Sequence, residues 1–130
     1  ALGLSGARAV YQSDDYVVVI DDASLLDPLK PDFVALSAFA VRGIAVTAPG
    51  RGYDFVTRWF GPRVGVNEDP VTGSAHTSLA PLWAERLGKN VLSCEQGGVR
   101  KGQLLCEVPG NGRVIISGRA ALYLRGQVYI

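Results

Sequence analysis

The organisation of this chain is set by one motif, Asn67-Glu68-Asp69-Pro70-Val71-Thr72-Gly73-Ser74-Ala75-His76, which runs directly into the apolar segment 79–87. Few polar residues interrupt that segment before Glu85 and Arg86, so the sequence predicts a helix that is buried nearly all round. A helix without a polar face cannot lie on a surface and needs cover on more than one side. We therefore expect a curved sheet that wraps this helix.

The motif also predicts a polar site at the beginning of the helix. Thr72 and Ser74 are both good N-cap residues, so the backbone N–H groups of residues 73–76 are expected to lack partners inside the helix. Free amides and the helix dipole favour a carboxylate or phosphate there, and Gly73 lets a ligand approach the backbone. Asp69, stiffened by the proline after it, would stand at the edge of the same pocket. The same residues are also typical of an ordinary loop and helix cap, in which loop side chains or water satisfy the amides.

Length and composition limit the class of protein. The 130 residues fit one domain, and a net charge of +1 without a basic run gives no reason to expect nucleic acid as a partner. The apolar runs are far shorter than the roughly 20 residues that span a bilayer, and no signal pattern opens the chain, so we expect no membrane partner and a cytoplasmic location. Cys94 and Cys106 are predicted to be buried thiols, and with the single histidine they form no recognisable metal site.

Most of the remaining chain is predicted to be strand. β-Branched and aromatic residues between turn formers indicate strands at residues 7–11, 16–20, 41–48, 53–60, 91–96, 103–108, 113–117 and 120–128. A short helix is expected over residues 32–38, Pro81 is expected to bend the long helix, and Gly88 is a natural C-cap. One long helix among about eight strands predicts an α+β fold, in which a mixed barrel-like β-sheet is wrapped around one central buried helix.

Two arginines precede the motif. Arg58 and Arg63 either bracket it with positive charge or lie as solvated charges on the surface, which is the commoner situation for arginine.

Four motifs carry a family resemblance: Asp54-Phe55-Val56-Thr57-Arg58-Trp59-Phe60, Glu68-Asp69-Pro70-Val71-Thr72-Gly73-Ser74-Ala75-His76, Ala80-Pro81-Leu82-Trp83-Ala84-Glu85-Arg86-Leu87-Gly88-Lys89 and Ser117-Gly118-Arg119-Ala120. With them the chain, from Ala1 to Ile130, closely resembles the C-terminal half of the PhzF-like proteins of phenazine biosynthesis. That family has the diaminopimelate epimerase fold. Its two pseudo-symmetric halves are each a barrel-like mixed sheet around a central helix, and the active site lies in the cleft between them. The resemblance implies that this chain is one such half.

The resemblance also implies roles for particular residues. The family's best-known activity is a cofactor-independent isomerisation of trans-2,3-dihydro-3-hydroxyanthranilate, in which a glutamate moves a proton between ring carbons. By resemblance Asp69, Gly73 and Ser74 occupy substrate-contacting positions, and we count Thr72, Ala75 and His76 with them as substrate-binding candidates. The amides of Gly73 and Ser74 would hold the substrate carboxylate. Asp69, the catalytic candidate, would bind the amino or hydroxyl group or orient a proton donor. No cofactor is implied.

The chain also departs from the family pattern. The family's catalytic glutamate and a glycine–histidine substrate-binding motif belong to the N-terminal half, which these residues do not include, and His76 is not that histidine. Racemases of the same superfamily use paired cysteines, but neither Cys94 nor Cys106 lies near the motif. Asp69 and Glu68 are therefore the local candidates for a base.

Three functions are compatible with the sequence. The first is the substrate-binding half of a PhzF-like isomerase that acts by proton transfer on a small amino or hydroxy carboxylic acid, with the missing N-terminal half as its partner. The second is a non-catalytic module that binds a small anion or a protein and self-associates through its exposed half-interface. The third is a self-paired enzyme, in which Glu68 or Asp69 acts across the cleft of a homodimer.

Overall fold

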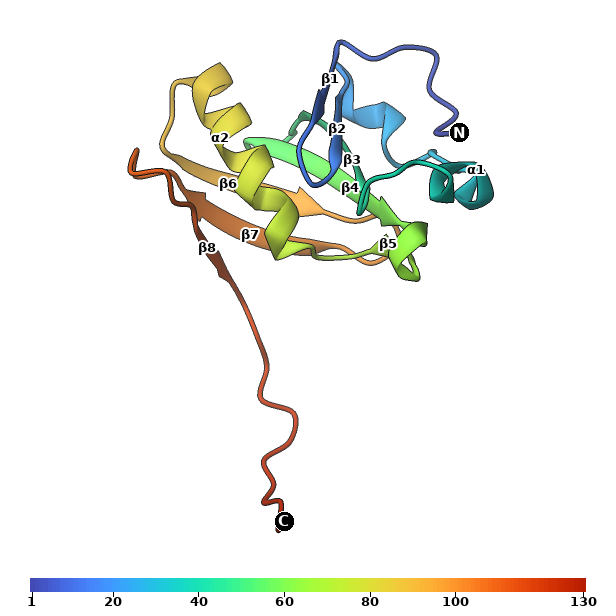
Figure 1. The fold of residues 1–130 in the computed structure, drawn as a ribbon. Coiled ribbons are helices and arrows are strands. Elements are labelled where there is room, and N and C mark those ends of the chain that lie inside the picture. Colours follow the sequence, from blue (N-terminus) through green and yellow to red (C-terminus); the bar gives the residue numbers. More distant parts are fainter.

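The chain forms one mixed sheet of eight strands and one main helix, and the computed structural model describes all of residues 1–130 (Figure 1). The strands are β1 (Ala9–Gln12), β2 (Tyr16–Val19), β3 (Ile44–Pro49), β4 (Phe55–Gly61), β5 (Val66–Asp69), β6 (Val91–Gln96), β7 (Gly102–Glu107) and β8 (Ile115–Gly118). The helices are α1 (Phe33–Ser37) and α2 (His76–Leu87), and the 3₁₀ turns are η1 (Ala23–Leu25), η2 (Pro62–Val64) and η3 (Gly73–Ala75). The strand order is β1-β2-β3-β4-β6-β7-β8, and β5 pairs with β4 outside this path. The pairs β2–β3 and β4–β6 are parallel and the others antiparallel, which makes the sheet mixed.

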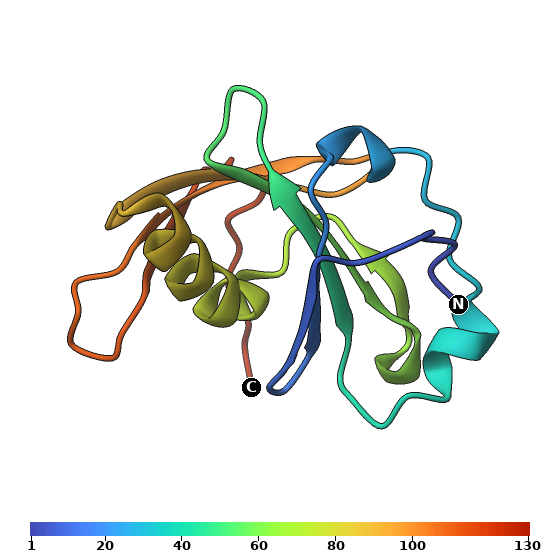
Figure 2. The same ribbon diagram turned by 90° about the horizontal axis from the view of Figure 1, so that it is seen from above.

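The sheet is curved, and α2 lies against its concave face (Figure 2). In the core between them, the Trp83 ring of α2 stacks on Phe55 of β4 with centroids 5.7 Å apart, and Trp83 Nε1 donates a hydrogen bond to Thr47 Oγ1 at 3.0 Å. A second apolar cluster, which includes Leu36 and Phe60, lies between the sheet and the segment that carries η1 and α1. The predicted α+β class, with a mixed sheet and one main helix, is confirmed.

One side of α2 remains uncovered. Leu79 and Trp83 are buried, whereas Pro81 is exposed and Leu87 is 40% exposed, so the prediction of burial nearly all round is wrong. The sheet is open, with β1 and β8 as unconnected edges, and it therefore covers the helix from one side. The helix runs through Pro81 as one element and ends at Gly88, whose left-handed conformation (φ 63°) confirms the predicted C-cap.

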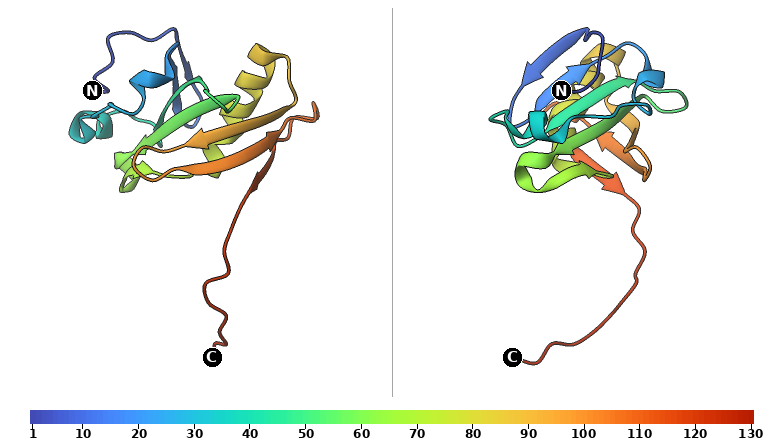
Figure 3. Two further views of the ribbon diagram at one scale, coloured as in Figure 1. Left: turned by 180° about the vertical axis from the view of Figure 1, so that it is seen from behind. Right: turned by 90° about the vertical axis from the view of Figure 1, so that its right-hand side faces the viewer.

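The strand predictions hold for most of the chain and fail at its C-terminal end. Residues 120–128, expected as a strand, form no ladder, and residues 119–130 extend away from the body of the molecule (Figure 3). Their large apolar side chains are each at least 78% exposed: Leu122, Tyr123, Leu124, Val128, Tyr129 and Ile130. The strand pattern is present, but these residues pair with no strand of the sheet. Conversely, β5 was not predicted, because three of its four residues are polar and all four are partly buried or exposed.

Two further sequence predictions can be compared with the fold. Cys94 and Cys106 are free and fully buried, as expected. No helix has the length and apolar character needed to cross a membrane.

Candidate functional site

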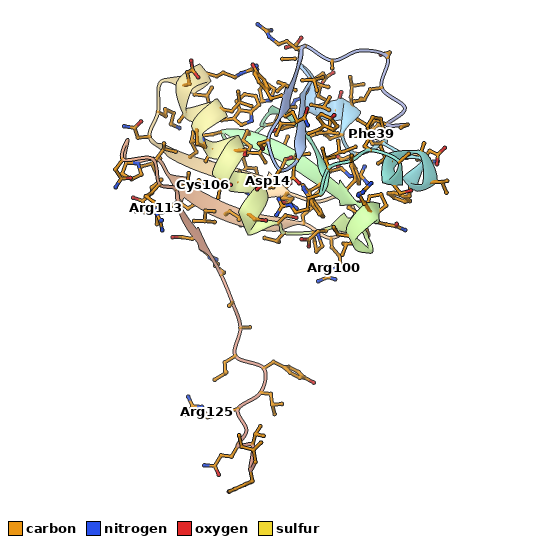
Figure 4. All side chains as sticks on the ribbon, in the orientation of Figure 1. Asp14, Phe39, Arg100, Cys106, Arg113 and Arg125 are labelled. Atoms are coloured by element: carbon orange, nitrogen blue, oxygen red, sulfur yellow. The ribbon has the colours of Figure 1, made fainter.

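The motif of residues 67–76 links the edge of the sheet to the beginning of α2. Asp69 is the last residue of β5 and is paired with Trp59 of β4 across a register irregularity. The chain then passes through a short loop and η3 into α2. The turn between β1 and β2 lies beside this junction, since Ser13 Oγ and Ser78 Oγ are 3.1 Å apart, and Asp14 of that turn is seen next to α2 in Figure 4.

The Asp69 carboxylate is fixed by its own loop. Oδ1 accepts a hydrogen bond from the Val71 amide at 3.3 Å, and Oδ2 accepts one from Thr72 Oγ1 at 2.7 Å. The Thr72 hydroxyl is therefore engaged with Asp69 and caps neither η3 nor α2, and Ser74 likewise makes no cap bond. The predicted N-cap roles are wrong because η3 intervenes before α2 and because Asp69 supplies a nearer acceptor for Thr72.

Gln96, at the end of β6, forms hydrogen bonds to the loop between β5 and η3 and was not identified from the sequence. Its side chain is fully buried, and its Nε2 donates to Asp69 O at 2.8 Å and to Thr72 Oγ1 at 2.9 Å. Its Oε1 accepts from the Thr72 amide at 3.0 Å. A signal did exist: Gln96 follows Leu92 and Cys94 at strand spacing on the buried face of β6, where a polar residue needs a specific partner.

The amides at the beginning of the helix are only partly free. The Ala75 amide donates to Thr72 O at 3.1 Å, and the His76 amide donates to Gly73 O and Ser74 O, so the expectation that these two are available is wrong. The amides of Gly73 and Ser74 donate no hydrogen bond within the protein. No atom lies within 4 Å of the position that a Cβ on Gly73 would take, so this stretch of backbone is open. The predicted anion site therefore consists of two backbone amides, those of Gly73 and Ser74, which we call the amide site.

His76 is a buried structural residue. Its ring is fully buried, lies 5.9 Å from the Phe55 ring, and has Nδ1 2.9 Å from Thr72 O. Because a carbonyl can only accept, Nδ1 carries the proton, and Nε2 has no partner. Burial lowers the pKa of His76, which keeps the ring neutral. The side chain ties the beginning of α2 to the loop and does not reach the surface.

A second polar cluster meets the site at Ser74. Asp15, from the β1–β2 turn, is 3% exposed and accepts hydrogen bonds from Arg42 Nε at 2.9 Å and from Trp59 Nε1 at 3.0 Å, with Arg42 Nη2 on its second oxygen. Arg42 Nη1 donates to Ser74 Oγ at 2.6 Å. The hydrogen bonds to Asp15 raise the pKa of Arg42 further. No local sequence pattern predicts these contacts, because Arg42 is 27 positions from Asp15 and 32 positions from Ser74.

Arg58 and Glu68 form a partly buried structural ion pair. Arg58 is 7% exposed; its Nε and Nη2 donate to the two oxygens of Glu68, each at 2.7 Å, and its Nη1 donates to Leu26 O at 2.7 Å. Arg58 is thus neither a solvated charge nor a free cation beside the motif, and Glu68 is not a free base. Arg63 is exposed and donates to Phe39 O at 3.3 Å. No group of three or more His, Cys, Asp or Glu side chains could hold a metal ion.

Comparison with known proteins identifies the family of the chain. The model of the phenazine biosynthesis-like protein family, PhzC-PhzF, matches residues 6–126. The chain belongs to the PhzC-PhzF family. It is 60% identical over its full 130 residues to an uncharacterized isomerase of Pseudomonas aeruginosa and 44% identical over 128 residues to a second one from the same organism, covering 49% of each. This PhzC-PhzF chain therefore spans about half the length of the curated relatives that it matches.

Solved structures of the family match the PhzC-PhzF chain over about half of their own length. The crystal structure of a PhzF-family phenazine biosynthesis protein from Enterococcus faecalis matches all of the chain and 50% of its own length, with a TM-score of 0.90 and 44% identity. A putative PhzC/PhzF protein from Clostridium difficile matches 96% of the chain and 48% of its own length, with a TM-score of 0.87 and 37% identity. The expected resemblance and the expected half of a PhzF-type fold are both confirmed.

Proposed function

We propose that this chain is the substrate-binding half of a cofactor-independent isomerase that moves a proton on a small amino or hydroxy carboxylic acid. The observation that carries the proposal is the amide site: two backbone N–H groups without protein partners, beside a fixed carboxylate, in a chain whose relatives are called isomerases. A substrate carboxylate would accept hydrogen bonds from the Gly73 and Ser74 amides and gain from the positive end of the α2 dipole.

Asp69 is the proposed partner of the substrate's amino or hydroxyl group. The Val71 amide and the Thr72 hydroxyl donate to its two oxygens, and Gln96 fixes Thr72 in turn. These bonds hold the Asp69 carboxylate in one orientation, while lone pairs remain to accept from an ammonium or hydroxyl group. In this proposal Thr72 and Gln96 support Asp69, and His76 supports the backbone of the amide site.

Proton transfer at carbon needs a second group across the substrate. Glu68 is engaged by Arg58, so Asp69 is the one acid of the motif that is free to act. We assign the other acid–base group to the N-terminal half, by resemblance to the family, because the chain spans half the length of its relatives. A cytoplasmic location is part of the proposal, and two free thiols fit a reducing compartment.

Ligand titration tests the amide site directly. Anthranilate carries a carboxylate beside an amino group, and aniline lacks the carboxylate. In the ¹⁵N-labelled chain, anthranilate should shift the amide resonances of Gly73 and Ser74 with a dissociation constant that Asp69→Asn raises, and aniline should not shift them. Absence of any response at these two amides to anthranilate, up to its solubility limit, would refute the proposed site.

A self-associating, non-catalytic module is the second candidate. It is favoured by the six large apolar side chains of residues 119–130, each at least 78% exposed, because exposed apolar surface promotes association. If this candidate is right, sedimentation should show a concentration-dependent dimer, and the N-terminal half of the Pseudomonas isomerase should produce no activity when mixed with the chain. Activity on mixing would favour the first candidate instead.

A further inference from the structure

Ser74 is held by three side chains that are linked by hydrogen bonds and come from separate parts of the sheet: Arg42, Asp15 and Trp59. Arg42 lies just before β3 and donates from Nη1 to Ser74 Oγ at 2.6 Å. Asp15 lies just before β2 and holds the other side of the same guanidinium, with Arg42 Nε and Nη2 on its two oxygens. A guanidinium bound at two nitrogens by one carboxylate has a fixed plane and direction. Arg42 Nη1, the donor that reaches Ser74, therefore has a fixed direction.

The Asp15 carboxylate is itself locked by Trp59. The indole Nε1 donates to Asp15 Oδ2 at 3.0 Å, and Arg42 Cζ lies 5.6 Å from the centre of the indole ring. Two glycines make room for that ring: a Cβ added at Gly43 or at Gly61 would come within 2.2 Å of Trp59 atoms. The indole ring therefore lies in a fixed position between the backbone at Gly43 and that at Gly61. Its contacts restrict the movement of the Asp15 carboxylate and the Arg42 guanidinium.

The hydrogen bond from Arg42 decides what the Ser74 hydroxyl can do. Arginine has donors only, so Ser74 Oγ accepts in this contact, and it makes no other hydrogen bond within the protein. Its own proton is therefore available to a group outside the protein that binds beside the amides of Gly73 and Ser74. A hydroxyl that already accepts from a cation is also a stronger donor.

We infer that Arg42, held by Asp15 and Trp59, is a positioning residue that fixes the Ser74 hydroxyl as a third donor to the carboxylate bound at the amide site. The inference rests on the proposed function and deepens it, because it assigns to the site a specificity for carboxylates over neutral groups. Asp15 balances the charge of Arg42, so the effect of Arg42 on the ligand passes through the orientation of Ser74 more than through its own charge.

A double-mutant cycle distinguishes an effect of Arg42 that passes through the Ser74 hydroxyl from a direct attraction between the Arg42 charge and the ligand. The dissociation constant of anthranilate is measured from the Gly73 and Ser74 amide resonances in the full chain, in Ser74→Ala, in Arg42→Lys and in the double variant. Arg42→Lys keeps a cation opposite Asp15, but a single ammonium cannot reproduce the planar fork that reaches Asp15 and Ser74 together. Arg63→Lys is the matched control, since that exposed arginine bonds only to Phe39 O.

We expect Ser74→Ala and Arg42→Lys each to raise the dissociation constant by about tenfold, and the double variant to raise it no further. Arg63→Lys should leave it unchanged. Additive effects would overturn the inference, because a direct attraction between Arg42 and the anion persists without the Ser74 hydroxyl. An unchanged constant in Arg42→Lys would also overturn it.

Two further results keep the test decisive. If Arg42→Lys does not fold, Trp59→Phe removes one hold on Asp15 without altering Arg42 or Ser74, and it should raise the constant by about two- to threefold; no change would contradict the inference. If the unaltered chain does not respond to anthranilate, the proposed function fails and this inference fails with it, whereas binding that is insensitive to Arg42 removes the inference alone.

Discussion

Replacing Gln96 with leucine should both destabilise the chain and loosen the loop that carries Asp69. The buried amide of Gln96 makes three hydrogen bonds, to Asp69 O, Thr72 Oγ1 and the Thr72 amide, at 2.8, 2.9 and 3.0 Å. Each bond contributes about 1 kcal/mol, and the Thr72 amide is left buried without a partner, so we expect a loss of about 2–4 kcal/mol in the free energy of unfolding. With a urea m-value of about 2 kcal/mol/M, the unfolding midpoint falls by about 1–2 M.

The assay is urea unfolding followed by circular dichroism, with Gln103→Leu as the matched control. Gln103 lies on the neighbouring strand β7, is exposed, and makes one side-chain bond, to Tyr53 Oη at 2.6 Å. Its replacement should change stability by no more than about 0.5 kcal/mol. If Gln96→Leu is no more destabilising than Gln103→Leu, the buried amide does not hold the loop and the reasoning about Asp69 is wrong.

Three further predictions concern pH and packing. Burial lowers the pKa of His76, so the unfolded chain binds the proton first as pH falls; stability should decline below about pH 6.5, and His76→Asn should flatten the urea midpoint between pH 7 and 5. Lys89 and the Ser93 amide hold the pKa of Asp54 below its ordinary value, so its contribution is present above about pH 4 and is lost as pH falls through the lowered pKa; Asp54→Asn should remove that acid-induced loss. Gly61→Ala places a methyl group against the Trp59 ring and should cost about 1–3 kcal/mol by thermal unfolding, whereas Gly6→Ala, with open space around it, should be neutral.

Regular periodicity made most of the fold predictable from sequence. Runs of β-branched and aromatic residues between turn formers located the strands, and the apolar segment after Ser74 located α2, because these patterns reflect burial on one or two faces. Residues 120–128 carry a similar apolar and aromatic run without forming a strand. A strand needs a neighbour to bond with, and the sequence pattern does not say whether the chain supplies one.

The site was predictable only where its residues are contiguous. Asp69, Gly73 and Ser74 form one motif, and the structure brings them together at the junction of β5 and α2. Asp15 and Arg42 come to Ser74 through the pairing of distant strands, and neither residue has a local pattern that distinguishes it from a surface charge. The N-cap assignment failed for a related reason, since the Thr72 hydroxyl had a choice of acceptors that only the folded loop decides.

The placement of the two tryptophans gives the molecule two separate optical probes. Trp59 lies against a carboxylate and a guanidinium that lead to Ser74, whereas Trp83 stacks on Phe55 inside the main core. Fluorescence of a Trp83→Phe variant would therefore report on charge rearrangement next to the junction without interference. Fluorescence of a Trp59→Phe variant would follow the melting of the interior. Ligand occupancy and unfolding can thus be recorded separately, each with its own single-tryptophan variant, without a dye or an isotope.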